Sequence, residues 1–262
     1  MNFDQYTKPN GPWSKIDGWN SQGVFRALKL INDEQIEAGT NGHVCEIGVH
    51  EGQLFNALAL LTRPRSKTFR ELSIAIDVFD NQELNVDHSG GSTLQAFKKH
   101  LKAILTGANG AYHRNVLTIK ADSLSLSAED IGAKVAAHLK QPVQDKTANE
   151  CIRLFSIDGG HTVVHALNDL KLAEQTLVAG GVVVVDDFMH PGWPGVTEAA
   201  HIYCSDKRSK LLPFAYGNNK LYLSHPSCIA RMLELFKTTK APTKQRREVI
   251  MWNEAMIWID FE

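Results

Sequence analysis

Short apolar segments alternate with longer amphipathic ones through most of the chain, and this alternation constrains the fold more than any other feature. Five short segments are predicted strands, at residues 43–47, 73–78, 116–121, 152–157 and 181–185. Segments with apolar residues at helical spacing follow them, at residues 53–62, 93–105, 128–139, 162–177 and 196–204. Strands that alternate with helices form a mostly parallel sheet with helices on both faces. The pattern therefore predicts an α/β fold with a doubly wound, Rossmann-like sheet.

Both ends of the chain extend this alternating core. A helix is predicted from about residue 21 to 38, and residues 211–216 and 220–224 are predicted to form a C-terminal antiparallel hairpin. A length of 262 residues suits one such domain. We expect a single domain 1–262, with an N-terminal helical extension (1–40), a catalytic core (41–225) and a C-terminal extension (226–262). The basic and aromatic tail from Lys237 is typical of a solvated turn followed by a packed element.

Composition excludes several classes of partner. The chain has 28 Lys and Arg against 29 Asp and Glu, and such a balance argues against a nucleic-acid binder, which must neutralise phosphates. The four cysteines lie far apart without metal-binding spacing, which is typical of free thiols. The sequence shows no signal-peptide pattern at its start and no apolar run near the roughly 20 residues of a membrane span. We expect a soluble, cytoplasmic protein without nucleic-acid or membrane partners.

A glycine-containing turn follows the first predicted strand, with the sequence Glu-Ile-Gly-Val-His-Glu-Gly at residues 46–52. Gly48 and Gly52 let the backbone approach a ligand closely. The turn lacks the middle glycine of a G-x-G-x-x-G fingerprint and the Lys-Ser/Thr of a P-loop. These absences disfavour a pyrophosphate cofactor and a nicotinamide-dependent oxidoreductase, while Glu46 favours a cationic or amine-bearing ligand.

Acidic residues also end the next two strands. Asp77 ends the second, and the pair Asp122-Ser123 follows the third. Ligands of doubly wound sheets bind at the carboxyl ends of the strands, where a carboxylate can accept both hydroxyls of a ribose. We expect these side chains to lie on one rim beside the glycine turn. A polar insert at 63–71 lengthens the spacing from Gly52 to Asp77.

Three further aspartates are predicted to converge at the same edge. Asp158 ends the fourth strand, and Asp186 and Asp187 end the fifth. Adjacent strands lie about 4.8 Å apart, and carboxylates this close repel one another unless a cation is present. Oxygen ligands without cysteine suit Mg²⁺, Ca²⁺ or Mn²⁺. The sequence predicts a divalent-metal site, and the alternative is that these aspartates only cap turns.

His161 lies three residues after Asp158, at the predicted start of a helix. A neutral imidazole there can take a proton from a hydroxyl, and a helix N-terminus lowers the pKa of a histidine. The alternative is a histidine hydrogen-bonded within the turn. Two loops, at 79–92 and 188–195, are expected to cover the site, and Trp193 in the second is a candidate to stack on the acceptor ring.

Taken together, these motifs resemble class I S-adenosylmethionine-dependent methyltransferases. The resemblance rests on Glu-x-Gly-x-x-x-Gly after the first strand, an acid after the second and Asp-Ser after the third. It implies that Gly48 and Gly52 line the methionine moiety with Glu46 nearby, and that Asp77 holds the ribose. The full set of cofactor-binding residues implied is Glu46, Gly48, Val49, Gly52, Asp77, Asp122, Ser123 and Asp158, of which Asp122 and Ser123 lie by the adenine.

A second resemblance is narrower. Asp-Gly-x-His, a helix and then Gly-Gly-(apolar)-Asp-Asp-Phe resemble the metal-dependent sugar O-methyltransferases of the macrocin and mycinamicin type, over about residues 42–205. It implies that Asp158, Asp186 and Asp187 bind Mg²⁺, that His161 is the catalytic base, and that a sugar or small-polyol hydroxyl accepts the methyl group. The alternatives are a catechol-type O-methyltransferase and a non-methylating relative of the cephalosporin hydroxylase group. A small-molecule acceptor is expected, and homo-oligomerisation stays open.

Overall fold

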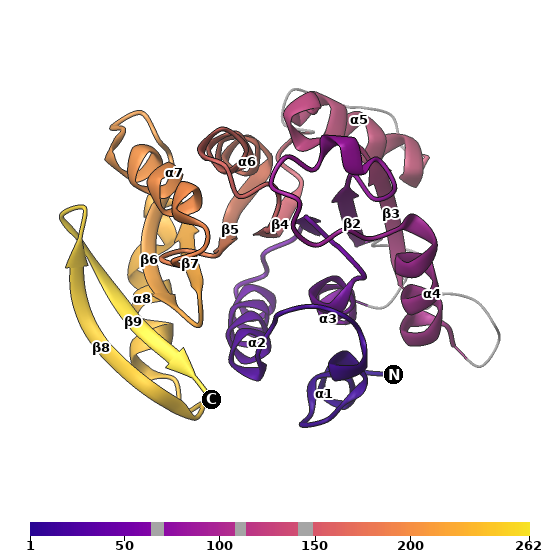
Figure 1. The fold of residues 1–262 in the computed structure, drawn as a ribbon. Helices are drawn as coiled ribbons and strands as arrows, with labels where there is room; N and C mark the ends of the chain where they lie inside the picture. The colour runs from indigo at the N-terminus through magenta and orange to yellow at the C-terminus, as the bar shows by residue number, and fades with distance from the viewer. Residues whose placement is uncertain (64–70, 108–113, 141–148) are drawn as a thin grey trace.

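A nine-stranded sheet forms the centre of the computed structural model, which describes residues 1–63, 71–107, 114–140 and 149–262 (Figure 1). The order across the sheet is β3-β2-β1-β4-β5-β7-β6-β9-β8. The strands are β1 (His43–Ile47), β2 (Leu72–Asp77), β3 (Asn115–Lys120), β4 (Ile152–Ile157), β5 (Leu177–Asp186), β6 (Leu212–Gly217), β7 (Lys220–Ser224), β8 (Thr243–Met251) and β9 (Glu254–Phe261). The predicted α/β fold is confirmed, and the middle of the predicted insert, 64–70, lies outside the described residues.

Strands β1 to β5 pair in parallel, and their order fixes where a ligand can bind. The chain runs outward from β1 through β2 to β3, then returns to place β4 and β5 on the other side of β1. This reversal between β1 and β4 is a topological switch point, where the connections leave in opposite directions and open a crevice at the carboxyl ends of the strands. The acidic residues that end the predicted strands were expected to lie in this crevice.

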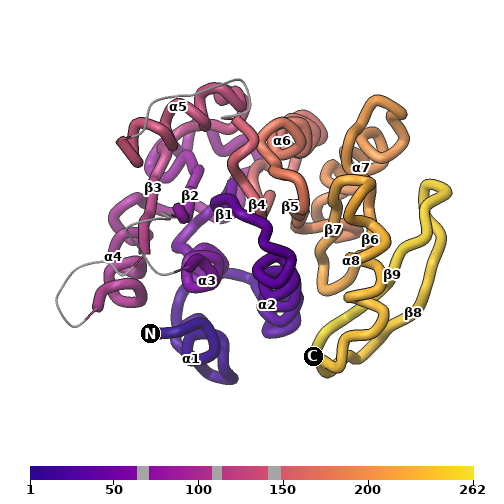
Figure 2. The backbone as a smooth tube through the Cα atoms, turned by 180° about the vertical axis from the view of Figure 1, so that it is seen from behind, coloured from indigo at the N-terminus to yellow at the C-terminus, as the bar shows by residue number. Residues whose placement is uncertain are grey.

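Helices cover both faces of the sheet (Figure 2). The helices are α1 (Phe3–Thr7), α2 (Gln22–Glu37), α3 (Gln53–Leu61), α4 (Leu94–Leu105), α5 (Ala128–Leu139), α6 (Val163–Thr176), α7 (Pro194–Ser205) and α8 (Pro226–Thr238). Helices α1 to α4 and α8 share one apolar core with one face, and α5 to α7 share a second core with the other. Strands β1, β4 and β5 are buried from both sides, which explains the fully apolar run at residues 181–185 of β5 and the mostly apolar sequences of β1 and β4. None of the described helices has the length and apolar character needed to cross a membrane.

The structure departs from the sequence prediction in β5 and in the C-terminal tail. Strand β5 begins at Leu177 instead of residue 181, and a register shift against β4 accommodates Gly180, whose φ of +83° is unusual in a strand. The β6–β7 hairpin is confirmed. The tail forms α8 and a second hairpin, β8–β9, which joins the sheet because β9 pairs in parallel with β6. The expected solvated turn is therefore wrong for residues 243–251, which form the edge strand.

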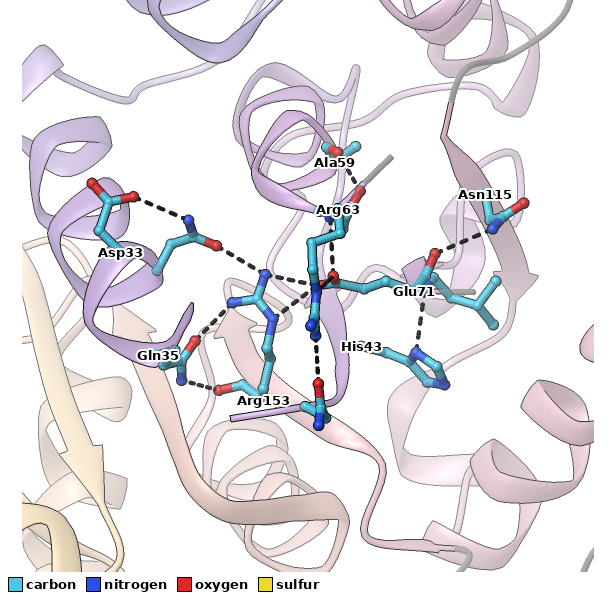
Figure 3. A network of polar contacts seen from close by, with 12 residues as sticks. Asp33, Gln35, His43, Ala59, Arg63, Glu71, Asn115 and Arg153 are labelled. Carbon is cyan, nitrogen blue, oxygen red and sulfur yellow. Dashed lines mark hydrogen bonds and ion pairs between the residues drawn. The ribbon is translucent and has the colours of Figure 1, made fainter. Parts of the chain in front are cut away.

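A buried polar network fixes the amino ends of the central strands, on the side opposite the crevice (Figure 3). The fully buried guanidinium of Arg153 in β4 lies 2.6 Å from the Glu71 carboxylate, which is equally buried. It also donates to the side chains of Gln35 and Asn32 from α2, at 2.8 Å each. Arg63 reaches the other Glu71 oxygen at 3.2 Å. The network satisfies a charge that burial would otherwise make very costly.

We expect Arg153→Met to destabilise the fold by about 3 kcal/mol, because it leaves the buried Glu71 carboxylate without its main partner. Urea unfolding monitored by circular dichroism measures this change. Arg208→Ala is the matched control, since it removes an exposed ion pair with Asp206 and should leave the midpoint unchanged. Equal midpoints for Arg153→Met and the wild type would contradict a stabilising role for the network.

Candidate active site

A cavity of about 660 Å³ opens at the carboxyl ends of the parallel strands. Its walls come from the ends of β1 to β5, from the β6–β7 turn and from residues 17–21 and 82–90. The predicted site residues that line it are Glu46, Gly48, Val49, Asp77, Asp122, Ser123, Asp158, His161, Asp186 and Asp187. Gly52 does not line the cavity and instead caps the start of α3 with a φ of +87°. The structure thus brings nearly all of the predicted residues to one place.

Gly48 joins the turns after β1 and β4. Its φ is +79°, and a Cβ atom at this position would lie 1.6 Å from the backbone oxygen of Asp158. Only glycine allows so close an approach, so the missing side chain lets the Asp158 turn pack directly on the glycine turn. This contact places the first predicted metal ligand beside the predicted cofactor turn.

Glu46 is buried at the floor of the cavity, with 1% exposure. Its Oε2 atom has no hydrogen-bond partner among the described residues. Burial, followed by the nearby charge of Asp158, raises the pKa of Glu46 well above its ordinary value. A buried carboxylate oxygen without a partner is costly, and a cationic ligand in the cavity would satisfy it.

Asp77 connects the glycine turn to the loop that follows β2. One carboxylate oxygen accepts from the backbone N–H of His50 at 2.8 Å and the other accepts from that of Phe79 at 2.6 Å. Burial raises the pKa of Asp77, and these hydrogen bonds offset part of the rise. A carboxylate has about four acceptor positions, so the three backbone N–H groups of Phe79, His50 and Val49 leave capacity for a ligand. The side chain can therefore shape both loops and bind a diol.

Asp122 and Ser123 occupy the far end of the same cavity. Asp122 caps the short 3₁₀ helix Ser123–Ser125 by accepting from the backbone N–H of Leu124 at 3.0 Å. Ser123 is nearly buried, and its backbone oxygen accepts from Asn168 in α6 at 3.2 Å. The two residues form a fixed wall after β3, as the sequence predicts.

Asp158, Asp187 and His161 form a compact cluster. Each offers one potential ligand atom, and these atoms lie within 4.8 Å of one another. His161 Nε2 lies 3.0 Å from Asp187 Oδ2 and 3.8 Å from Asp158 Oδ1. Two carboxylates and an imidazole at such distances can hold a divalent cation with further oxygen ligands. Asp186 lies outside this cluster, although the sequence places it there.

Asp186 instead forms an ion pair with Lys220, a residue that the sequence analysis did not identify. The antiparallel pairing of β5 with β7 puts these two residues opposite each other, and Lys220 is 3% exposed. Burial lowers the pKa of Lys220, but the charges of Asp186 and Asp158 outweigh this effect, and the net shift is upward. Lys220 therefore stays charged. The sequence feature that could have identified Lys220 is its place as a single lysine at the start of an apolar strand.

The surroundings of His161 raise its pKa, whereas the sequence analysis expected a lowered pKa. Burial lowers its pKa, but hydrogen bonds with Asp158 and Asp187 and the charge of Asp87 raise it to about 10. The expected lowering of its pKa by the helix N-terminus is wrong, because three carboxylates surround the ring. The sequence analysis did not identify Asp87, which lies in the loop after β2 and reaches His161 Nδ1 at 2.9 Å.

Trp193 stacks on the imidazole of His161, with ring centroids 4.2 Å apart and planes 18° apart. The sequence analysis proposed it as a stacking surface for the acceptor. In the structure one face of the indole is covered by the histidine, and the residue also lines the cavity. Both predicted covering loops, 79–92 and 188–195, therefore contact the proposed base.

The glycine turn after β1, the carboxylate at the end of β2 and the crevice at the switch point define a class I S-adenosylmethionine-dependent methyltransferase. The sequence profile of a family described as a methyltransferase domain matches residues 45–188. This match spans more than half of the chain, so the protein belongs to this methyltransferase family. None of the curated proteins compared with the chain matches it.

Several solved structures are similar in fold. The O-methyltransferase NovP is 13% identical with a TM-score of 0.55, over 79% of this chain and 83% of its own. CalS11, a TDP-rhamnose 3'-O-methyltransferase of calicheamicin biosynthesis, is 18% identical with a TM-score of 0.49, over 77% of this chain and 79% of its own. MycE from the mycinamycin pathway, solved with Mg and S-adenosylhomocysteine, is 13% identical with a TM-score of 0.46, over 85% of this chain and 53% of its own. At these identities the likeness is one of fold.

We expect Asp77→Ala to weaken binding of S-adenosylhomocysteine at least tenfold, because it removes a charged acceptor that shapes two walls of the cavity. Isothermal titration calorimetry measures the affinity. Asp80→Asn is the control, since Asp80 lies three residues away, faces Lys120 and does not line the cavity. Unchanged affinity in Asp77→Ala would remove this residue from the cofactor site.

Proposed function

We propose that the protein transfers the methyl group of S-adenosylmethionine to a hydroxyl of a sugar or another small polyol, with the assistance of Mg²⁺. The observation that carries this proposal is the cluster of Asp158, Asp187 and His161 in the same cavity as the glycine turn. The fold of NovP, an O-methyltransferase, supports oxygen as the acceptor atom. The Asp-Gly-x-His and Asp-Asp-Phe motifs support a sugar or polyol.

In this proposal the cofactor lies along the carboxyl ends of β1 to β3. Gly48 and Val49 line the place proposed for the methionine moiety, and Gly52 acts from outside the cavity by starting α3. The unpartnered oxygen of Glu46 faces the positive charge of that moiety. Asp77 holds the ribose, and Asp122 and Ser123 lie by the adenine. S-adenosylmethionine supplies a methyl group on a sulfonium, which is already a strong electrophile. The main task of the chain is therefore to hold the acceptor oxygen in line with that methyl group.

Asp158 and Asp187 are the proposed primary metal ligands, since hard carboxylate oxygens suit Mg²⁺. The amide of Asn219 donates to Asp187 at 2.6 Å and fixes that carboxylate. Asp186 remains the predicted third ligand, although its Oδ2 atom is paired with Lys220. When bound, Mg²⁺ supplies positive charge that lowers the pKa of an acceptor hydroxyl.

His161 is the proposed base. Its Nε2 atom points to the two aspartates, where a hydroxyl held near them would present its proton. A divalent cation held by Asp158 and Asp187 would offset two of the three carboxylate charges that raise the pKa of His161, and the charge of Asp87 would remain. The imidazole then takes the hydroxyl proton while the oxygen attacks the methyl group.

Two alternative functions differ in measurable ways. A catechol-type enzyme would use the same residues on an aromatic acceptor, so a panel of glycosides and catechols assayed with Mg²⁺ separates the two. A relative of the cephalosporin hydroxylases would consume no S-adenosylmethionine. Formation of S-adenosylhomocysteine with any acceptor of the panel excludes that reading. We propose that residues 1–262 act as one domain, with a core of 41–225 between two extensions.

We expect Asp187→Asn to lower the affinity for divalent metal at least tenfold, because it removes one of two carboxylates at the cluster. Electron paramagnetic resonance with Mn²⁺ measures binding without an acceptor. Asp206→Asn, at an exposed ion pair, is the control. Full methyl transfer by the wild type in excess chelator would contradict a role for Mg²⁺ in the reaction.

We expect His161→Ala to lower the rate of methyl transfer by about 10²- to 10⁴-fold, the usual contribution of a general base. Binding of S-adenosylhomocysteine should persist in calorimetry, because His161 contacts the metal side of the cavity. His138→Ala, at an exposed position of α5, is the control. Wild-type turnover in His161→Ala would show that another group takes the proton.

A further inference from the structure

We propose that Asp87 is a positioning residue that fixes the orientation of the His161 ring and keeps the Nε2 atom free for the reacting proton. Asp87 belongs to the loop 79–92, far from His161 in the sequence. The inference rests on the proposed function, in which His161 is the base. It assigns to this loop a role beyond covering the cavity.

One oxygen of Asp87 holds His161 at two points. Asp87 Oδ2 accepts from the backbone N–H of His161 at 2.7 Å and lies 2.9 Å from its Nδ1 atom. Both side chains are largely buried, with exposures of 10% and 11%. The backbone contact fixes where the residue sits and the side-chain contact fixes how its ring is turned, so the ring cannot rotate without breaking a buried hydrogen bond.

Asp87 is itself held in place by its own loop. Its Oδ1 atom accepts from the backbone N–H of Ser89 at 2.9 Å and from the Ser89 hydroxyl at 2.5 Å. The loop is anchored to the glycine turn, because His50 Nδ1 lies 2.7 Å from the Gly90 oxygen and the Ser92 hydroxyl donates to the His50 oxygen. The carboxylate therefore has a fixed position relative to the predicted cofactor turn.

The two nitrogens of His161 have different partners. Nδ1 faces Asp87, whereas Nε2 faces Asp187 and Asp158 at the proposed metal site. A carboxylate accepts a hydrogen bond from Nδ1, so this contact turns Nε2 toward the proposed metal site. In the neutral imidazole that the proposed function requires, the proton stays on Nδ1 and Nε2 is the nitrogen that accepts the proton of the hydroxyl. Trp193 on one face of the ring restricts its tilt.

The same loop also lines the cavity where an acceptor must lie. Leu84, Asn85 and Val86 are among the lining residues, and Leu84 and Val86 are exposed apolar side chains. A group bound against these residues touches the segment that carries Asp87. The loop therefore links one wall of the cavity to the residue that orients His161.

The test uses the full chain with Asp87→Ala, Asp87→Asn and Asp87→Glu, and with Asp80→Asn as the matched control on the same loop. Nitrogen-15 NMR of labelled histidine, with S-adenosylhomocysteine and Mg²⁺ bound, reports the hydrogen-bonded Nδ1 proton of His161 without any acceptor. The signal is assigned by its absence in His161→Gln. We expect it in the wild type and in Asp80→Asn, and we expect its loss in Asp87→Ala.

Kinetics with the best acceptor from the glycoside and catechol panel complete the test. We expect kcat to fall about 10- to 100-fold in Asp87→Ala and Asp87→Asn, with the KM for S-adenosylmethionine within twofold and partial recovery in Asp87→Glu. An intact Nδ1 proton signal and an unchanged kcat in Asp87→Ala would overturn the proposal. A loss of S-adenosylhomocysteine affinity that matches the loss of rate would also overturn it, by showing a purely structural role. Full activity in His161→Ala would instead refute the proposed base, a result that the Asp87 variants cannot produce.

Discussion

The ion pair between Lys220 and Asp186 is the interaction on which the charge balance of the site depends. Six of the predicted site residues at the carboxyl ends of the strands are carboxylates, and Lys220 is a buried cation that interacts with four of them, Glu46, Asp158, Asp186 and Asp187. Like charges at these distances raise one another's pKa values and favour protonation. One internal ammonium group offsets part of that repulsion permanently. Asp158 and Asp187 are not paired directly with Lys220 and instead lie beside the imidazole of His161.

The two ends of β4 have different roles: residues at its start stabilise the fold, and the residue after its end lines the cavity. Arg153 near its start is held by Glu71 and by side chains of α2, and this network is fully satisfied. Asp158 just after its end lies in a cavity, beside a buried oxygen of Glu46 that has no described partner. The first arrangement lowers the free energy of the fold, and the second leaves polar groups for a ligand to satisfy. The amino end of β4 is therefore fixed by satisfied polar contacts, whereas polar groups at its carboxyl end are left for a ligand to satisfy.

The sequence predicts the strands, the helices and most of the cavity because periodicity and strand-end residues are local signals. The side chains of Glu46, Asp77 and Asp158 reach the cavity because each lies at the end of a parallel strand. Lys220 and Asp87 could not be predicted from the sequence, because their roles depend on contacts that are not local. Their importance depends on antiparallel register and on a loop that crosses to α6, and neither is visible in local spacing. The expected lowering of the His161 pKa was wrong partly for the same reason, since Asp187 and Asp87 are distant in sequence, although Asp158 lies only three residues away.

The C-terminal strands contribute to the site although they lie outside the cofactor fold. A Cβ atom at Gly217 would lie 1.8 Å from the backbone oxygen of Ile259, so β9 packs directly on the end of β6. Asp260 accepts from the backbone N–H of Asn218 at 2.6 Å, and the Asn218 side chain bonds to the backbone of Phe261 in both directions. The next residue, Asn219, donates to Asp187. The position of Asp187, a proposed metal ligand, is thus linked through Asn218 and Asn219 to contacts made by β9.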